Sequence, residues 1–172
     1  MRLAGEAWRV FFDSFQREAF RLETRPVYDM ASEREEYEQF LATGELHIRD
    51  EDPWLARVRQ FRADGRWIGR VHVLRQPLGD YLRYELAVYR HTSQAGEDIR
   101  ILDLTTQPDP GLPGQDFWLF DESAVVRMDY DDRGRQTGRE LLEDLNPAPY
   151  VAWKRTALAR AQPLVQYLRL AG

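Results

Sequence analysis

Apolar positions along the first half of the chain alternate between helical and strand periods. The first segment carries four aromatic residues on one side of a helix: Trp8, Phe11, Phe12 and Phe15. Residues 19–24 then alternate apolar and polar side chains like a short strand, which ends before Pro26. The sequence therefore predicts a helix followed directly by a strand.

Two further helices are predicted before the next strand. Ser32 and Glu35 have the spacing of a capping box, which indicates a short helix that a glycine closes at position 44. Asp52 is a good N-cap for a second helix, because a proline follows it at the first helical position and one face carries apolar residues. A glycine at position 65 ends this helix.

A strand, a helix and another strand follow in the middle of the chain. Residues 67–74 are rich in branched apolar side chains, and the turn at 77–79 leads to Asp80, which we expect to cap a helix that Gly96 ends. Residues 98–104 form the next predicted strand. Helices that alternate with strands favour crossover connections and adjacent parallel strands.

The last third of the chain has the pattern of an antiparallel meander. A loop rich in proline and glycine over 108–114 precedes predicted strands over 116–120, 124–130 and 135–142. The last two of these strands are joined by a hairpin turn with Gly134 where positive φ is needed. A final helix is predicted to begin at 146–147 and to end before Pro163.

These elements predict an α/β (α+β) protein with a single mixed sheet. Helices flank the sheet, and the C-terminal part is an antiparallel meander with a final helix. A length of 172 residues suffices for one hydrophobic core, so we expect one domain over residues 1–172 with a C-terminal tail at 164–172.

Composition excludes several classes of protein. The chain lacks cysteine, which excludes disulfides, thiolate zinc sites and cysteine catalysis, and no apolar run approaches the ~20 residues of a membrane-spanning helix. All but one of the 24 basic residues are arginine, but they are interleaved with acids and the net charge is −5, which argues against direct nucleic-acid binding. Charged residues interrupt the apolar N-terminal stretch, so we expect no signal peptide and a cytoplasmic protein.

No motif in the sequence indicates a catalytic residue, a cofactor or a metal. Asp129, Asp131, Gly134 and Glu140 have the spacing of an EF-hand loop, but a cation occupies position five and the flanks alternate like strands, which favours a β-hairpin. The three histidines have no metal-ligand spacing, and His72 is expected to be a hydrogen-bonded core residue.

One polar cluster is a candidate ligand-binding site. It lies where a strand ends and a helix begins, which is where α/β proteins usually bind ligands. Its members are Tyr81, Arg83, Tyr84 and Glu85 on the helix, with Asp98 and Arg100 on the next strand. We expect a polar pocket in which these residues meet one another or Glu23. The alternative is that Arg83 and Glu85 form ordinary surface ion pairs of about 0–1 kcal/mol each.

The C-terminal tail is a candidate interaction surface. Tyr167, Leu168 and Leu170 are apolar and follow Pro163, which ends the last predicted helix. A chain of this length leaves them few intramolecular partners, so the tail is a candidate for docking on another subunit, as in a homodimer, or on a partner protein.

Several blocks of the sequence, in order, resemble the actinobacterial DUF6879 family. The resemblance covers about residues 11–163. Its most specific blocks are Phe11-Phe12-Asp13-Ser14-Phe15, Ala19-Phe20-Arg21-Leu22-Glu23, Asp80-Tyr81-Leu82-Arg83-Tyr84-Glu85-Leu86, Gly96-Glu97-Asp98-Ile99-Arg100 and Asp116-Phe117-Trp118-Leu119-Phe120-Asp121.

The family carries no assigned activity. The resemblance implies a gene neighbourhood, in Streptomyces and its relatives, with helix-turn-helix regulators and small DUF397 proteins, and hence an accessory role in a regulatory module. The order of elements also looks like a phospholipase D-type lobe, whose catalysis needs His-x-Lys-x-x-x-x-Asp. The single lysine, Lys154, has no histidine two positions before it, so a lobe of that type is here without its catalytic motif.

Two functions remain open from the sequence. The first is a non-enzymatic regulatory or protein-interaction domain that acts with a helix-turn-helix transcriptional regulator. The alternative is a small-ligand sensor or an enzyme that uses the polar pocket at the start of the helix from Asp80.

Overall fold

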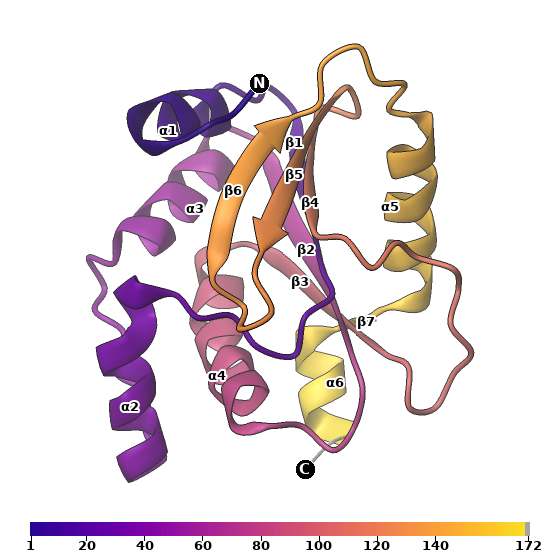
Figure 1. The fold of residues 1–172 in the computed structure, drawn as a ribbon. Coiled ribbons are helices and arrows are strands. Elements are labelled where there is room, and N and C mark those ends of the chain that lie inside the picture. Colours follow the sequence, from indigo (N-terminus) through magenta and orange to yellow (C-terminus); the bar gives the residue numbers. More distant parts are fainter. Residues whose placement is uncertain (171–172) are drawn as a thin grey trace.

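A mixed sheet of seven strands forms the centre of the computed structural model, which describes residues 1–170 (Figure 1). The strand order is β6-β5-β4-β1-β2-β3-β7. The strands are β1 (Glu18–Glu23), β2 (Trp67–Leu74), β3 (Asp98–Asp103), β4 (Phe117–Phe120), β5 (Ala124–Tyr130), β6 (Gln136–Leu141) and β7 (Gln162–Pro163).

The described residues also form six α-helices and one 3-10 helix. They are α1 (Gly5–Asp13), η1 (Ala31–Glu33), α2 (Arg34–Thr43), α3 (Pro53–Ala63), α4 (Asp80–Ala95), α5 (Ala148–Arg160) and α6 (Leu164–Leu170). None of them is long and apolar enough to cross a membrane.

The topology confirms the predicted mixed α/β fold. Strands β1, β2 and β3 are parallel neighbours, and the helices α3 and α4 make the crossovers between them. Strands β4, β5 and β6 form the predicted antiparallel meander, which joins the parallel strands where β4 pairs with β1. The meander thus continues the sheet instead of forming a separate layer.

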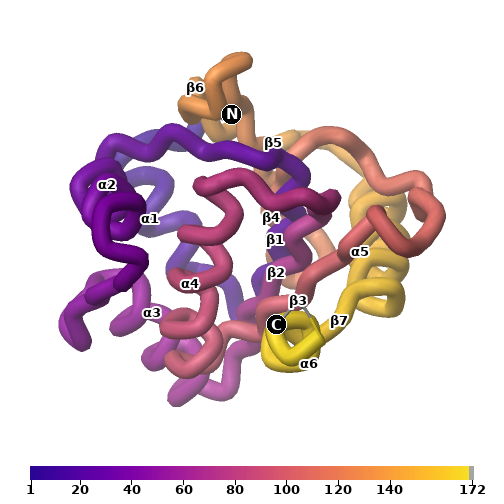
Figure 2. Tube along the Cα trace, turned by 90° about the horizontal axis from the view of Figure 1, so that it is seen from below, coloured from indigo at the N-terminus to yellow at the C-terminus, as the bar shows by residue number. Residues whose placement is uncertain are grey.

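The helices lie on both faces of the sheet. Both views place α1, α2, α3 and α4 on one side of the strands and α5 on the other (Figures 1 and 2). Phe12 of α1 and Phe61 of α3 pack with Trp118 in one apolar layer, while Phe20 and Phe117 face α5 in the other. Alternate residues of each strand therefore enter two different cores, as the period of a strand requires.

Local signals explain some helix ends and fail at others. The Asp52 side chain accepts hydrogen bonds from the backbone N–H groups of Trp54 and Leu55, which confirms the predicted N-cap of α3. The capping box predicted at Ser32 is wrong, because the 3-10 helix already begins at Ala31 and no side chain caps it. Asp80 is the first residue of α4 and not its cap.

The predicted hairpin between β5 and β6 is confirmed, and it uses the EF-hand-like residues in structural contacts. Asp129 and Glu140 both accept hydrogen bonds from Arg127, and Asp131 accepts the backbone N–H groups of Arg133 and Arg135 in the turn. These carboxylates stabilise the hairpin, and those of Asp129 and Glu140 share the Arg127 guanidinium as an ion-pair partner.

The C-terminal tail forms the short helix α6 on the same chain. Leu164 and Tyr167 are buried against Leu82 and Leu86 of α4 and the neighbouring residues of β3. Val165 and Leu170 remain exposed. Residues 171 and 172 of the predicted tail lie outside the described residues.

Candidate functional site

A row of charged residues lies on the inner face of the two central parallel strands. The parallel register places Arg21 opposite Arg70 and Glu23 opposite His72. Residues two apart on a strand share a face, so all four side chains point toward the layer of α1, α3 and α4. Although they are polar, Arg21, Glu23 and His72 are at most 6% exposed, like the apolar residues next to them on the two strands.

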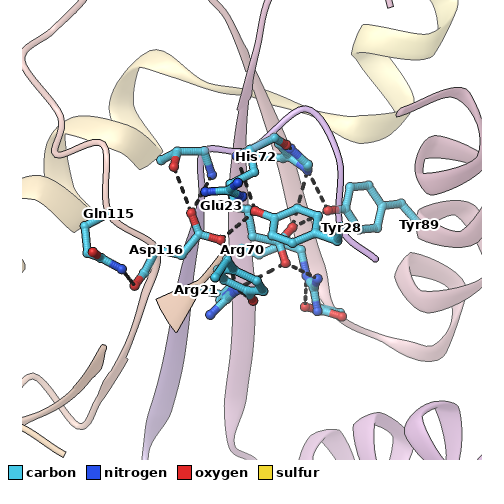
Figure 3. Close-up of polar contacts among 12 residues, drawn as sticks. Arg21, Glu23, Tyr28, Arg70, His72, Tyr89, Gln115 and Asp116 are labelled. Atoms are coloured by element: carbon cyan, nitrogen blue, oxygen red, sulfur yellow. Dashed lines mark hydrogen bonds and ion pairs between the residues drawn. The ribbon is translucent and has the colours of Figure 1, made fainter. Parts of the chain in front are cut away.

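Glu23 is the centre of this buried network (Figure 3). One of its carboxylate oxygens lies 3.0 Å from the Arg70 guanidinium and 3.4 Å from Nε of Arg21. The other accepts a hydrogen bond from the Tyr89 hydroxyl and lies 3.3 Å from Nδ1 of His72. Burial raises the pKa of Glu23, but Arg70, His72 and Arg21 together hold it well below its ordinary value.

Asp116 anchors the other end of the row. Its carboxylate accepts hydrogen bonds from Arg21 at 3.1 Å, from the Tyr28 hydroxyl at 2.5 Å and from the backbone and side chain of Thr24 at 2.9 and 2.8 Å. These contacts hold the segment after β1 against the start of β4 (Figure 3). Arg21 is thereby fixed between two carboxylates, those of Glu23 and Asp116.

The row forms one wall of a cavity of about 300 Å³ between the sheet and the helices. Arg21, Glu23 and Arg70 line it from the sheet, Glu85 and Tyr89 from α4, and Glu33 and Arg139 from η1 and β6. Three tryptophans contribute apolar walls: Trp8, Trp54 and Trp118. A cavity with apolar walls and a few convergent polar groups is the usual form of a small-molecule site.

Two polar atoms of residues in this wall have no hydrogen-bond partner among the described residues, and a third residue, Glu85, has no counter-charge. Nη1 of Arg21 and Nε of Arg139 are buried without a hydrogen bond. Glu85 is 7% exposed and forms no ion pair among the described residues, and the hydroxyl groups of Tyr81 and Tyr89 beside it donate to Glu33 and Glu23. Each buried atom without a partner costs about 1–3 kcal/mol, and two of the four such atoms of the described residues, the others being Nε of Arg25 and Oε1 of Gln162, belong to residues that line this cavity.

The electrostatics of the cavity follow from burial and from neighbouring like charges. Burial and the nearby charge of Glu23 raise the pKa of Glu85. Burial and the charge of Glu85 raise the pKa of Glu33 to about 7. Burial also lowers the pKa of Arg139, and the Arg21 guanidinium lowers it further. The cavity thus has an acidic part, formed by Glu85 and Glu33, and a basic part that includes Arg139. In each part, burial and a neighbouring like charge disfavour the charged form.

Glu23, His72 and Glu85 are the residues closest to a metal-ligand arrangement. One potential ligand atom of each lies within 4.8 Å of the others. However, Nε2 of His72 lies 2.9 Å from the carbonyl oxygen of Arg25, and Nδ1 lies 2.8 Å from the Tyr89 hydroxyl, whose proton goes to Glu23. Both ring nitrogens therefore donate, and a proton occupies the position that a metal would take on Nδ1.

That protonated form agrees with the environment of the ring. Burial lowers the pKa of His72, but the hydrogen bond to Glu23 and its charge raise it above the ordinary value. Because Glu23 is also committed to two guanidinium groups, Glu85 alone in this trio offers free oxygens. The trio fits a buried ion-pair network better than a cation site.

The structure brings some of the sequence-predicted site residues to the cavity and not others. Glu85 lines it beside Glu23, whereas Tyr81 and Tyr84 are buried on α4 and donate hydrogen bonds to Glu33 and Glu36. Arg83 points away from it, since its side chain is 61% exposed and pairs with Asp80 at 2.9 Å.

Asp98 and Arg100 lie elsewhere. They pair with each other at 3.0 Å on β3, and Arg100 also reaches the carbonyl oxygen of Leu158 on α5. Arg100 is in register with Val71, whose side chain packs in the α5 layer. It is therefore on the opposite face of the sheet from the cavity.

Sequence reasoning missed three arginines of the polar wall, Arg21, Arg70 and Arg139, and the buried Asp116 that holds Arg21, whereas His72 is the hydrogen-bonded core residue that it predicted. A signal was present in the two central strands, because Arg21 and Glu23, like Arg70 and His72, are polar residues at alternate positions of otherwise apolar strands. Such a pattern in a strand that is buried on both faces predicts an internal polar network.

Comparison with known proteins gives a family but no activity. The model of a domain of unknown function, DUF6879, matches residues 6–169. No curated protein matches the chain.

Proposed function

Since the chain belongs to the DUF6879 family, for which no function is described, we propose a role from the geometry of its cavity. It is a non-enzymatic regulatory domain that binds a small polar ligand between the sheet and the helices α1, α3 and α4. Ligand binding in turn controls its contact with a partner protein, for which we propose a helix-turn-helix transcriptional regulator.

The observation that carries the ligand-binding role is the set of unpartnered buried groups. Arg21 and Arg139 each carry a buried N–H without an acceptor, Glu85 forms no ion pair among the described residues, and all three residues line one cavity of about 300 Å³. A folded domain pays for each of these groups unless something else completes their hydrogen bonds. A ligand that did so would gain affinity from groups that are already desolvated and fixed in place.

The cavity wall favours binding over catalysis. Thr92 is the one aliphatic hydroxyl in the described lining, and its hydroxyl donates to the carbonyl oxygen of Val88. His72 does not line the cavity, and its nitrogens are engaged by Arg25 and Tyr89. A hydroxyl nucleophile next to a free histidine base, as serine or threonine catalysis requires, is thus missing from the described wall.

The segment η1–α2 is the proposed route from ligand to partner. Glu33 of η1 lines the cavity, and α2 follows it directly. Unlike the other α-helices, α2 has no buried residue, and Leu41 on it is 50% exposed. Elements with few buried contacts open or shift at low cost, so a change at Glu33 would move α2 before it moves the sheet.

A ligand screen tests this function. A thermal-shift screen of cellular metabolites should raise the melting temperature of the wild-type protein with one compound class, and calorimetry should then give its affinity. Glu85→Gln should abolish the shift, whereas Arg83→Ala, which changes a surface arginine of the same helix, should keep it. Equal shifts in both variants would overturn the role of the cavity.

The partner is tested separately. The tagged protein should recover a helix-turn-helix protein from its own cell extract in stoichiometric amount, and added ligand should change that amount. Recovery of the same amount with and without ligand, and with Glu85→Gln, would contradict the coupling of the two events.

A further inference from the structure

The charges that line the cavity do not all cancel within the protein. Arg57 pairs with Asp13 at 2.6 Å, and Arg70 pairs with Glu23 and Glu97. Arg139 has no acidic partner among the described residues. After these pairs are formed, one cation, Arg139, and two acids, Glu33 and Glu85, remain without a counter-charge.

The basic part of the cavity is arranged to receive an anion. Arg139 lies over the ring of Trp8 at 5.1 Å and donates to Gln136, which leaves its buried Nε free. Arg21 lies over Trp118 at 5.7 Å, and its Nη2 donates to the Tyr130 hydroxyl at 2.8 Å and to Asp116, which leaves Nη1 free. Two guanidinium groups that line one cavity and are fixed by other contacts match the two oxygens of a carboxylate.

The acidic part is arranged to receive a cation. Glu85 is buried and forms no ion pair among the described residues, and Glu33 accepts a hydrogen bond from Tyr81 at 3.1 Å. A protonated amine has three N–H groups, so it can donate to both carboxylates and separate their charges.

We propose that the cavity binds a small zwitterion of the amino-acid class, with its carboxylate on Arg21 and Arg139 and its ammonium group on Glu85 and Glu33. This inference rests on the proposed function and names its ligand. Arg139 is the one uncompensated cation, so a singly charged carboxylate balances the basic part better than a doubly charged phosphate. The walls formed by Trp8, Trp54 and Trp118 favour an apolar or aromatic side chain on the ligand.

Calorimetry with matched probes tests the two charged contacts. The probes are tryptophan, phenylalanine and leucine, each beside its decarboxylated amine and its deaminated acid. At least one amino acid should bind, and removal of either charged group should weaken binding by roughly tenfold or more, because a charged hydrogen bond at a buried site is lost.

Variants then assign each contact. Arg139→Gln should reduce the affinity for the amino acid to that for its decarboxylated amine, and should leave the affinity for the amine unchanged. Glu85→Gln should reduce the affinity for the amino acid to that for its deaminated acid, and should leave the affinity for the acid unchanged. Arg83→Ala is the matched control on the surface and should leave all three affinities unchanged. Circular dichroism of each variant checks that it is folded.

Failure of this inference is distinguishable from failure of the proposed function. If another class of compound binds and Glu85→Gln abolishes its binding, the cavity is a ligand site and the zwitterion is wrong. If an amino acid binds equally well in Arg139→Gln and Glu85→Gln, it binds elsewhere, and both the inference and the role of the cavity are overturned. Binding of none of the nine probes also overturns the zwitterion.

Discussion

His72 and Glu23 lie opposite each other on adjacent parallel strands, with Nδ1 of the histidine 3.3 Å from a carboxylate oxygen of the glutamate. Both side chains are almost fully buried. Because a backbone carbonyl holds the other ring nitrogen, the imidazole is fixed in the orientation in which it stabilises the negative charge of Glu23. The buried network around Glu23 is therefore fixed in the protein without a ligand.

This relationship predicts a pH dependence of folding that His72→Gln removes. The pKa of His72 is raised in the folded state, because the contacts with Glu23 outweigh burial. The stabilisation is therefore fully present below the ordinary pKa of about 6.5 and is lost as the pH rises through the raised value. Urea unfolding from pH 5.5 to 9 should show a deficit of about 1–3 kcal/mol for His72→Gln at low pH that shrinks as the pH increases. His47→Gln, at an exposed position, is the control, and a deficit that grows with pH would contradict the assignment.

Glu33→Gln should change the pH dependence of the free energy of unfolding at lower pH than His72→Gln does. Burial and Glu85 raise the pKa of Glu33 from 4.5 to about 7, so the folded state favours its protonated form. Its ionisation therefore costs stability as the pH rises from about 4.5 through 7. Relative to wild type, Glu33→Gln should gain on the order of 1–3 kcal/mol across this range, measured by urea unfolding at pH 4.5 and pH 8. If the difference in unfolding free energy between the variant and wild type stayed constant with pH, burial would not raise the pKa of Glu33.

Gly134 is the position of the hairpin where a side chain should be tolerated least. Its φ is +83°, and an added Cβ would lie 2.4 Å from the carbonyl oxygen of Val27. Gly111 is a matched control, because its φ is +77° but its surroundings are open. Gly111→Ala should cost about 1 kcal/mol from backbone strain, and Gly134→Ala should cost clearly more, because backbone atoms must move. Equal melting temperatures for the two variants would contradict the close approach of the hairpin to residues 27–29.

Asp121 should stabilise the start of β1 through its ionised side chain. Its carboxylate accepts the backbone N–H groups of Gln16, Arg17 and Glu18, at 2.8, 2.7 and 3.0 Å. Burial raises the pKa of Asp121, but these hydrogen bonds lower it overall. Asp121→Ala should cost about 1–3 kcal/mol at pH 7, and the difference from wild type should fall as acid titrates the folded carboxylate below about pH 4. Asp121→Asn keeps one acceptor oxygen, so its free energy of unfolding in chemical denaturation should lie between those of wild type and Asp121→Ala. A cost equal to that of the alanine variant would show that charge alone matters.

The fold could be predicted to a greater extent than the site, for a physical reason. The helix from Pro53 and the strand from Trp67 are specified by nearby residues, such as the Asp52 cap and the run of branched side chains. The start of the 3-10 helix at Ala31 depends instead on long-range contacts, because Asp29 bonds to the backbone of Gly134 just before it. Local capping signals at Ser32 cannot report such a contact.

The cavity depends on strand register in the same way. Glu85 was within reach of sequence reasoning, since polar residues after a strand are common in binding sites. Arg21 and Arg139 belong to β1 and β6, which are separated in the sheet by two other strands, and only the assembled sheet brings their guanidinium groups to one cavity. The pairing of Asp98 with Arg100 on the α5 face could not be distinguished from a pocket by spacing alone.

Lys154, the single lysine of the chain, provides a test of how α5 is held to the sheet. Its ammonium group pairs with Glu18 and, at 3.0 Å, with Glu122, and it lies 5.8 Å from the ring centre of Trp67. The lysine is 6% exposed, but the side chains of its two partners are 25% and 35% exposed, so water can solvate them when the lysine is absent.

Lys154→Met, which keeps most of the aliphatic volume, should therefore cost about 1 kcal/mol or less, whereas Lys154→Ala should cost about 2–4 kcal/mol because it leaves a cavity beside Trp67. Urea denaturation at low and high salt separates the two causes, since screening weakens the ion pairs but not the packing. If the methionine variant were as unstable as the alanine variant, the charge of Lys154 rather than its packing would hold α5 in place.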